Sequence, residues 1–254
     1  MGFLDAVILG IVEGFTEFLP ISSTGHLILA SSLLGLTQTD FLKSFEIAIQ
    51  LGAILAVVAL YWRKFLDIEV LKRLAVAFIP TGIIGLLLYR IAKTYLIGNE
   101  TVVVWALLIG GITLIAFEYF HTEKQSIDSV EAMTYRQSAL VGLFQAVAII
   151  PGVSRSAATI LGGLALGLHR TTIVEFAFLL AVPTMLAATC LDLLKSAGAF
   201  RMDEFGILAI GFVVSFAVAL ASIKFLLHFV RRYTFTAFGV YRILIALVFL
   251  FWLV

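Results

Sequence analysis

The sequence predicts an all-α polytopic membrane protein, built as an inverted repeat of two similar halves. Three observations carry this prediction: the composition, the length of the apolar segments, and a pattern that recurs half a chain further on. Hydrophobic residues make up 62% of the 254 residues and charged residues only 13%, against about 25% in ordinary soluble domains. The mean hydropathy is +1.12. So few charges cannot cover the surface of a soluble protein of this size.

Six apolar segments are long enough to cross a bilayer, for which a helix needs about 20 residues, with roughly 17–25 tolerated. Charged or Gly/Asn-containing loops separate them. The predicted transmembrane helices are approximately 42–62, 74–91, 101–119, 172–192, 206–228 and 236–253.

Four shorter apolar pieces form two pairs, and a proline-containing break interrupts each pair. The pieces lie near 2–18, 23–36, 137–149 and 155–168. Non-helical backbone at membrane depth is tolerated only where protein or a water-filled cavity satisfies it. Each pair, over 1–36 and 137–168, therefore predicts a re-entrant helical hairpin whose tip is a candidate site.

The two breaks share a pattern at an offset of 132 residues, in which glycine, a carboxylate or amide, and serine recur at equal spacing. The matching sets are Gly10, Glu13 and Ser22, and Gly142, Gln145 and Ser154. FEIAIQLG at 45–52 also resembles VEFAFLLA at 174–181. The chain is thus predicted to be a single integral membrane domain over 1–254, with halves of about 1–120 and 133–254. Each half has one hairpin and three transmembrane helices, and because three is odd the second half is inverted.

The distribution of lysine and arginine predicts that both termini face outside, because cytoplasmic loops carry the excess of positive charge. In that orientation, ten such residues lie in inner loops: Arg63, Lys64, Lys72, Arg73, Lys124, Arg136, Arg170, Lys224, Arg231 and Arg232. Five lie in outer loops: Lys43, Arg90, Lys93, Lys195 and Arg201. The other two, Arg155 and Arg242, fall within apolar segments.

Net charge and cysteine usage exclude other classes of protein. The net charge is +1 and is spread over short loops, so nucleic-acid binding is not expected. The single cysteine, Cys190, has no partner for a disulfide or a thiolate metal cage.

The first break, EGFTEFLPISSTGH at 13–26, carries two carboxylates on one helical face. Glu13 and Glu17 are four residues apart. Two like charges in an apolar setting repel, and a divalent cation with oxygen ligands neutralises them. We therefore expect Glu13 and Glu17 to bind a metal. The alternative is that Glu17 caps a structural hydrogen-bond network.

A new helix is expected to start after Pro20, because Ser22, Ser23 and Thr24 are residue types that favour N-caps. The first amides and the dipole of such a helix make an anion site. Ser23 and His26 are three residues apart and lie on one face, as a nucleophile and its base would. The alternative is that His26 is a hydrogen-bonded core residue.

The second break, PGVSRSAAT at 151–159, repeats this arrangement with a positive charge. Arg155 lies in apolar sequence and needs an anionic partner, for which phosphate has the right geometry. Ser154, Ser156 and Thr159 add hydroxyls, and Thr159 shares the face of Arg155. A structural ion pair between Arg155 and a glutamate remains the alternative. Together the breaks predict a phosphate or diphosphate ligand, and a phosphorylated lipid could reach it sideways from the bilayer.

At these residues the chain resembles the undecaprenyl-diphosphate phosphatase family, the bacterial membrane enzymes associated with bacitracin resistance. Five blocks carry the resemblance: EGFTEFLPISSTGH at 13–26, FEIAIQLGAILAV at 45–57, MTYRQ at 133–137, PGVSRSAAT at 151–159 and EFAFLLAVP at 175–183. The resemblance implies hydrolysis of undecaprenyl diphosphate to undecaprenyl phosphate and inorganic phosphate, which recycles the cell-wall lipid carrier. It also implies an active site on the outer face of the bacterial plasma membrane and a divalent cation, Mg or Ca.

Carried over by motif, the resemblance marks eight site residues: Glu13, Glu17, Ser22, Ser23, His26, Ser154, Arg155 and Thr159. Our hypothesis for the mechanism is that Ser23 attacks phosphorus, His26 manages the proton and Arg155 stabilises charge. Glu17 and Glu13 would organise the metal. The expected substrate-binding residues are Ser22, Thr24, Ser154, Ser156 and Thr159. The chain departs from the family at Ala157, where glycine is common. Attack by a water, with Ser23 as a phosphate ligand, is an open alternative, as is a transporter or flippase of a phosphorylated polyprenyl lipid. A homodimer is also left open.

Overall fold

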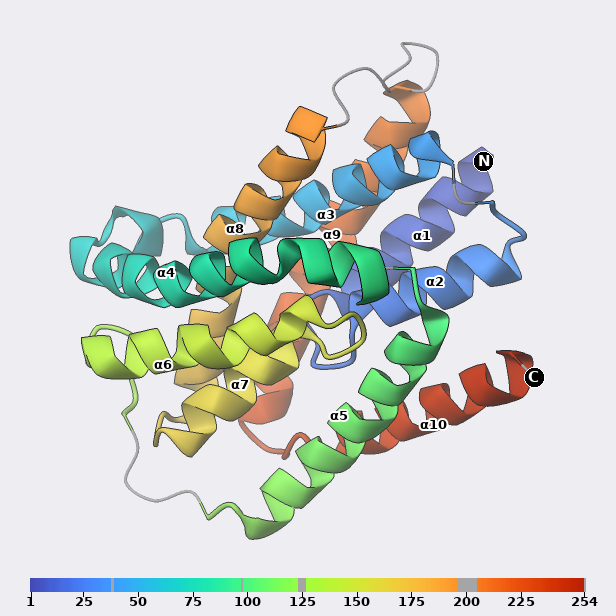
Figure 1. Cartoon of the computed structure of the whole chain (residues 1–254). Coiled ribbons are helices and arrows are strands. Elements are labelled where there is room, and N and C mark those ends of the chain that lie inside the picture. The colour runs from blue at the N-terminus through green and yellow to red at the C-terminus, as the bar shows by residue number, and fades with distance from the viewer. Residues whose placement is uncertain (38, 97, 123–126, 196–204, 254) are drawn as a thin grey trace.

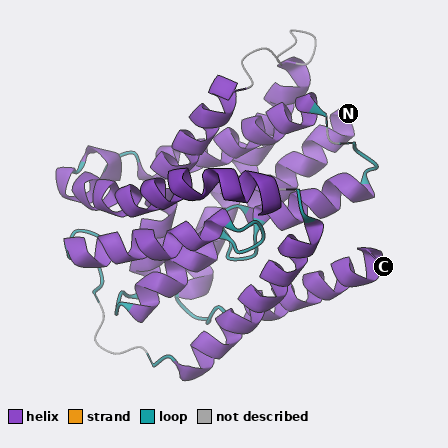
Figure 2. Ribbon diagram, in the orientation of Figure 1, coloured by secondary structure: helices purple, strands orange, loops and turns teal. Residues whose placement is uncertain are grey.

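The described part of the chain is a bundle of helices (Figures 1 and 2). The structure is a computed structural model and describes residues 1–37, 39–96, 98–122, 127–195 and 205–253. Within these residues the only β-type pairing is one isolated bridge between Ile127 and Leu168. The all-α prediction is therefore confirmed.

Five helices in the described residues are long and apolar enough to cross a membrane. They are α3 (Asp40–Tyr61), α4 (Ile68–Ile91), α5 (Glu100–Phe120), α8 (Arg170–Lys195) and α9 (Phe205–Val230). The sixth predicted span, α10 (Thr236–Leu253), is an apolar helix of shorter length. The chain is thus a multi-pass membrane protein with five helices of spanning length in its described part.

Helix α4 begins six residues before the predicted start at 74. The side chain of Asp67 caps it, because the carboxylate accepts the amides of Glu69 at 2.8 Å and Val70 at 3.3 Å. A cap of this kind satisfies helix-end donors that have no partner within the helix. The charged turn that precedes the apolar run is therefore helical too.

Four shorter helices correspond to the apolar pieces that flank the two breaks. They are α1 (Phe3–Thr16), α2 (Ser23–Leu33), α6 (Tyr135–Ala146) and α7 (Arg155–Ala165). Three single turns complete the helical elements of the described residues: 3₁₀ turns at Lys64–Leu66 and Val147–Ile149, and a π turn at Ala92–Leu96. Both breaks thus interrupt a helix where proline, glycine and serine predict an interruption.

The tips of the α1–α2 and α6–α7 hairpins meet inside the bundle (Figure 1). The Ser156 hydroxyl donates a hydrogen bond of 2.7 Å to the Phe18 carbonyl oxygen, which ties one tip to the other. Helix α1 packs against α9 and α6 packs against α4, each through a close approach of backbones. A Cβ on Gly10 would lie 2.9 Å from the Gly211 carbonyl oxygen, and one on Gly142 would lie 1.9 Å from that of Ala77.

Helix α4 turns large apolar side chains away from the protein. Ile79, Ile83, Leu86 and Leu87 are each more than half exposed. An uninterrupted apolar face of this kind is compatible with lipid and not with water. Helix α8, in contrast, contributes the consecutive core residues 176–182, so it lies inside the bundle and carries the packing around the tips.

Candidate active site

Each hairpin tip ends on a serine that caps the following helix in a strained backbone conformation. Ser22 caps α2 and Ser154 caps α7, with φ of 71° and 74°. The Ser22 hydroxyl accepts the Gly25 amide at 3.5 Å, and that of Ser154 accepts the Ala157 amide at 3.2 Å. Left-handed backbone at a residue other than glycine costs about 1–3 kcal/mol and concentrates at functional sites. The two tips therefore use the same local device to start a helix.

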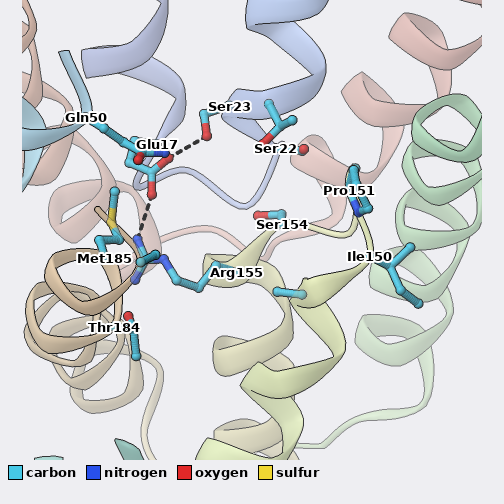
Figure 3. A pocket seen from close by; sticks show the side chains of 14 residues that line it. Glu17, Ser22, Ser23, Gln50, Ile150, Pro151, Ser154, Arg155, Thr184 and Met185 are labelled. Carbon is cyan, nitrogen blue, oxygen red and sulfur yellow. Dashed lines mark hydrogen bonds and ion pairs between the residues drawn. The ribbon is translucent and has the colours of Figure 1, made fainter. Parts of the chain in front are cut away.

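A pocket of about 270 Å³ lies between the two tips (Figure 3). The tips supply its polar wall, and α3 and α8 close it. Its lining residues include Glu17, Ser22, Ser23, Thr24, Gln50, Ser154, Arg155, Thr184 and Met185. Ligand pockets for drug-sized molecules measure roughly 300–1,000 Å³. This pocket is therefore large enough for a headgroup and too small for a long hydrocarbon chain.

The Glu17 carboxylate joins the first residue of α2 to the first residue of α7 (Figure 3). Its Oε2 accepts a hydrogen bond from the Ser23 hydroxyl, and its Oε1 accepts one of 2.9 Å from Arg155 Nη2. The side chains of Glu17 and Arg155 are 8% and 15% exposed. The predicted alternative, an ion pair between Arg155 and a glutamate, is thus present, and both partners line the pocket. A second guanidinium nitrogen of Arg155 donates to the Ala177 carbonyl oxygen at 3.3 Å.

His26 and Ser23 have different hydrogen-bond partners, which corrects the expected pairing of nucleophile and base. Its Nδ1 lies 2.8 Å from the Ser22 carbonyl oxygen and its Nε2 lies 2.8 Å from the Tyr241 hydroxyl. The His26 and Tyr241 rings also stack, with an interplanar angle of 6°. The physical reason is that the Ser23 hydroxyl has a carboxylate acceptor, which makes a stronger hydrogen bond than a neutral imidazole.

Two of the five expected substrate-binding residues lie outside the pocket. Ser156 is 2% exposed and holds the two tips together through Phe18. Thr159 is fully buried and donates to the Arg155 carbonyl oxygen at 2.8 Å. Each hydroxyl donates a hydrogen bond to a backbone carbonyl oxygen. Both residues therefore contribute to the packing of α7 and not to the wall of the pocket. The other three expected residues, Ser22, Thr24 and Ser154, line the pocket.

The Glu13 carboxyl is fully buried, and neither oxygen has a hydrogen-bond partner. A buried ionisable group without a partner is costly, so it is expected to be neutralised. The described residues contain no cluster of three or more His, Cys, Asp and Glu side chains that could close a metal cage. Mg²⁺ needs no such cage, because it is commonly bound by one or two carboxylates together with substrate phosphates and waters. Of the two predicted metal ligands, Glu17 lines the pocket and Glu13 is not among the lining residues. The chemistry of this pair of carboxylates fits that mode.

Four residues at or beside the tips were not predicted as site residues from the sequence. Gln50 and Thr184 line the pocket from α3 and α8, and Tyr241 and Arg242 contact the tips from α10. An isolated amide within an apolar span was the available signal for Gln50, and Pro183 within a span was that for its neighbour Thr184. For Arg242 the signal was a charge in an apolar run with no carboxylate nearby.

Comparison with known proteins gives a consistent result over nearly the whole chain. The family model described as bacitracin resistance protein BacA matches residues 6–248. A protein of Aquifex aeolicus named undecaprenyl-diphosphatase is 54% identical over 246 residues, which cover 96% of each chain. Proteins with the same name from a Sulfurihydrogenibium species and from Wolinella succinogenes are 52% and 50% identical. They cover 99% and 100% of this chain, and 100% and 99% of their own length.

Proposed function

We propose that this chain, which belongs to the family of the bacitracin resistance protein BacA, hydrolyses undecaprenyl diphosphate to undecaprenyl phosphate and inorganic phosphate. Relatives that are about half identical over their full length carry the name undecaprenyl-diphosphatase. The reaction recycles the lipid carrier of cell-wall synthesis and underlies bacitracin resistance. The small pocket supports this proposal, because its volume suits a diphosphate headgroup and would leave the polyprenyl chain in the surrounding lipid.

The observation that carries the chemistry is the carboxylate of Glu17 between Ser23 and Arg155. A diphosphate that enters the pocket competes with Glu17 for the guanidinium, because Arg155 can bind two phosphate oxygens at once. Glu17 is then free to take the proton of the Ser23 hydroxyl. The step forms a bond from Ser23 Oγ to the terminal phosphorus and breaks the bond from that phosphorus to the bridging oxygen. Glu17 passes this proton to the leaving undecaprenyl phosphate and becomes a carboxylate again. It then takes a proton from a water that attacks the phosphoserine phosphorus. The bond from phosphorus to Ser23 Oγ breaks, Oγ recovers the proton from Glu17, and inorganic phosphate leaves.

The first amides of α2 and α7 assist this step from both sides of the pocket. Helix starts present backbone donors and the positive end of the helix dipole. Such donors stabilise the charge that builds up on the transferring phosphoryl group. His26 contributes by fixing the start of α2, through its contacts with the Ser22 carbonyl and Tyr241.

Phosphate release from purified protein in detergent tests the proposal. Wild-type protein should release inorganic phosphate from undecaprenyl diphosphate and from a shorter polyprenyl diphosphate, whereas Ser23→Ala should release little. A transporter or flippase of the same lipid would release none. Retention of wild-type activity by Ser23→Ala would assign the attack to water and leave Ser23 as a phosphate ligand.

We propose a divalent cation, Mg or Ca, held by Glu13 and Glu17. Bound there, it would supply positive charge to the phosphate oxygens. The unpartnered oxygens of Glu13 support this proposal. Chelation should abolish turnover, and Glu13→Gln should raise the metal concentration for half-maximal turnover by roughly tenfold or more. Turnover measured against metal concentration checks both, and full activity in chelator would contradict the proposal.

We also propose an inverted repeat of two halves, about 1–120 and 133–254, each with one re-entrant hairpin. Equivalent residues in the two halves support it. The caps Ser22 and Ser154 have the same unusual backbone conformation at the predicted offset. Gly10 and Gly142, also equivalent, both allow a helix to approach a backbone carbonyl closely. The two helices of each hairpin also diverge from their tip toward the same side of the bundle, α1 and α2 to the right and α6 and α7 to the left of Figure 1, which supports the proposal.

Both termini and the active site are proposed to face the outside of the plasma membrane. The two chain ends lie toward the right of Figure 1, with the junction of α2 and α3, whereas the α3–α4 junction lies at the left and the α9–α10 junction at the lower middle. Those junctions carry Arg63, Lys64, Arg231 and Arg232, which favour the cytoplasm. Of the other counted charges, Lys124 and Arg201 lie outside the described residues.

A reporter fused to the C-terminus measures this orientation. A reporter enzyme that works only in the periplasm should be active when it is fused to the C-terminus. A reporter enzyme that works only in the cytoplasm should be inactive at the same position. A fusion placed after Arg63 should give the reverse pattern. Activity of the cytoplasmic reporter at the C-terminus would show that the count of positive charges predicts the wrong orientation.

A further inference from the structure

Arg242 on α10 is a fully buried arginine that donates all of its hydrogen bonds to backbone carbonyls. A guanidinium has five N–H donors in a fixed fork, and each finds a different acceptor here. The acceptors are the carbonyl oxygens of Pro20 at 3.3 Å, Gly152 at 2.9 Å, Val153 at 2.9 Å, Ala106 at 2.9 Å and Leu107 at 3.3 Å. One acceptor belongs to the first tip, two belong to the second, and two belong to α5.

No carboxylate pairs with Arg242 in the part of the chain that the structure describes. A buried cation without an anionic partner carries a large desolvation cost. Arg170, the other arginine that is nearly buried, has Glu118 as its partner. The cost at Arg242 is offset only by the carbonyls of the two tips and α5, which would otherwise be buried and unsatisfied.

We infer that Arg242 is a positioning residue for the phosphatase reaction, which clamps the two hairpin tips in the relative position that the site requires. Pro20 precedes Ser23 by three residues, and Val153 precedes Arg155 by two. The clamp thus fixes both backbones directly upstream of the two side chains that meet at Glu17. Lysine could not replace it, because an ammonium has three donors and no planar fork.

The inference rests on the proposed phosphatase function. It adds that Arg242 holds the two tips, and with them Ser23 and Arg155, in a fixed relative position. Glu17 reaches Ser23 and Arg155 from opposite halves of the chain. A misplacement of about 1 Å can reduce catalysis by roughly 10²-fold. Arg242 touches none of the reacting groups and acts only through the tip backbones.

Gly110 on α5 offers a way to disturb the clamp while the charge of Arg242 is kept. A Cβ at this position would lie 2.1 Å from Arg242 Nη2 and 2.7 Å from Arg242 Cζ, and its three nearest atoms all belong to that side chain. Gly110→Ala therefore displaces the guanidinium from its carbonyls. Gly85 on α4 is the matched control, because a Cβ there meets nothing within 4 Å. Both changes replace a helical glycine by alanine.

The test is steady-state phosphate release from undecaprenyl diphosphate, normalised to folded protein by size-exclusion chromatography. Gly110→Ala should lower kcat by roughly tenfold to a hundredfold with a much smaller change in KM. Gly85→Ala should leave both constants unchanged. In an Arg242→Met background, Gly110→Ala should cause no additional loss, because the group that it displaces is gone.

Arg242→Lys provides a second variant if the methionine variant does not fold. It keeps the buried charge and should still show the drop in kcat, whereas Arg170→Lys should keep kcat. An unchanged kcat per folded Gly110→Ala or Arg242→Lys protein would overturn the inference, even with a lower melting temperature. A rise in KM alone would also overturn it, because it would assign Arg242 to attraction of the substrate. A wild-type protein that releases no phosphate would overturn the proposed function and this inference together.

Discussion

Replacement of Arg155 by alanine should lower kcat/KM by roughly 10²–10³, the loss typical when one preorganised donor to a transition state is removed. Arg155 is the cationic side chain among the residues that line the pocket. Its guanidinium is held by Glu17 at 2.9 Å and by the Ala177 carbonyl. It is therefore poised at the pocket before any ligand binds. Initial rates over a range of substrate concentrations give the two constants.

Arg155→Lys separates charge from geometry. Lysine keeps the positive charge but cannot bind two phosphate oxygens at once, so much of the activity should be lost while the protein stays folded. Loss in both kcat and kcat/KM would assign Arg155 to the transition state, whereas a rise in KM alone would assign it to substrate binding. Arg73→Lys, at a similarly covered arginine outside the pocket, is the control and should be silent. A folded Arg155→Ala protein within a few fold of wild type would make the ion pair with Glu17 purely structural.

Glu17→Gln should lower kcat by roughly 10²–10⁴, the contribution typical of a positioned general base. The amide cannot accept the Ser23 proton, and it removes the negative partner of Arg155. Glutamine has nearly the shape of glutamate, so the pocket should persist. Single-turnover measurements should show that the chemical step is slowed.

The matched control is Glu69→Gln, because Glu69 pairs with Lys72 and Arg73 on α4 and its side chain is 49% exposed. Exposed ion pairs contribute little, so this variant should behave like wild type. If Glu17→Gln retained most of the activity, the Ser23 proton would need another acceptor. The scheme in which Glu17 activates the nucleophile would then fail.

The helix positions could be predicted from the sequence because backbone in lipid must satisfy its own hydrogen bonds, and a helix does so within one segment. Apolar length set the long helices, and the prolines and serines of the two breaks set their interruptions. The start of α4 was missed by six residues, since the Asp67 cap extends the helix into charged sequence. The spacing of apolar residues alone does not show whether a capping residue or a run of charged residues determines where a helix begins.

Several of the predicted residues line the pocket, but their contacts were not predicted. Sequence spacing placed Ser23 beside His26, but the hydroxyl turns to Glu17, six residues away across the break. Such a contact depends on how the chain folds back at the tip, which helical periodicity does not describe. Arg242 was not predicted because its partners are backbone carbonyls, and every residue type supplies those.

The contact between Glu17 and Arg155 also determines when during biosynthesis the site can exist. The two residues are 138 positions apart, and at about 5–20 residues per second a ribosome needs roughly 7–28 s to make that stretch. Over that interval Glu17 has been made and Arg155 has not, so their contact cannot form until the second half follows. Completion of the site is therefore a late event in synthesis, and a chain that ends between the halves has the carboxylate of Glu17 without the arginine that pairs with it.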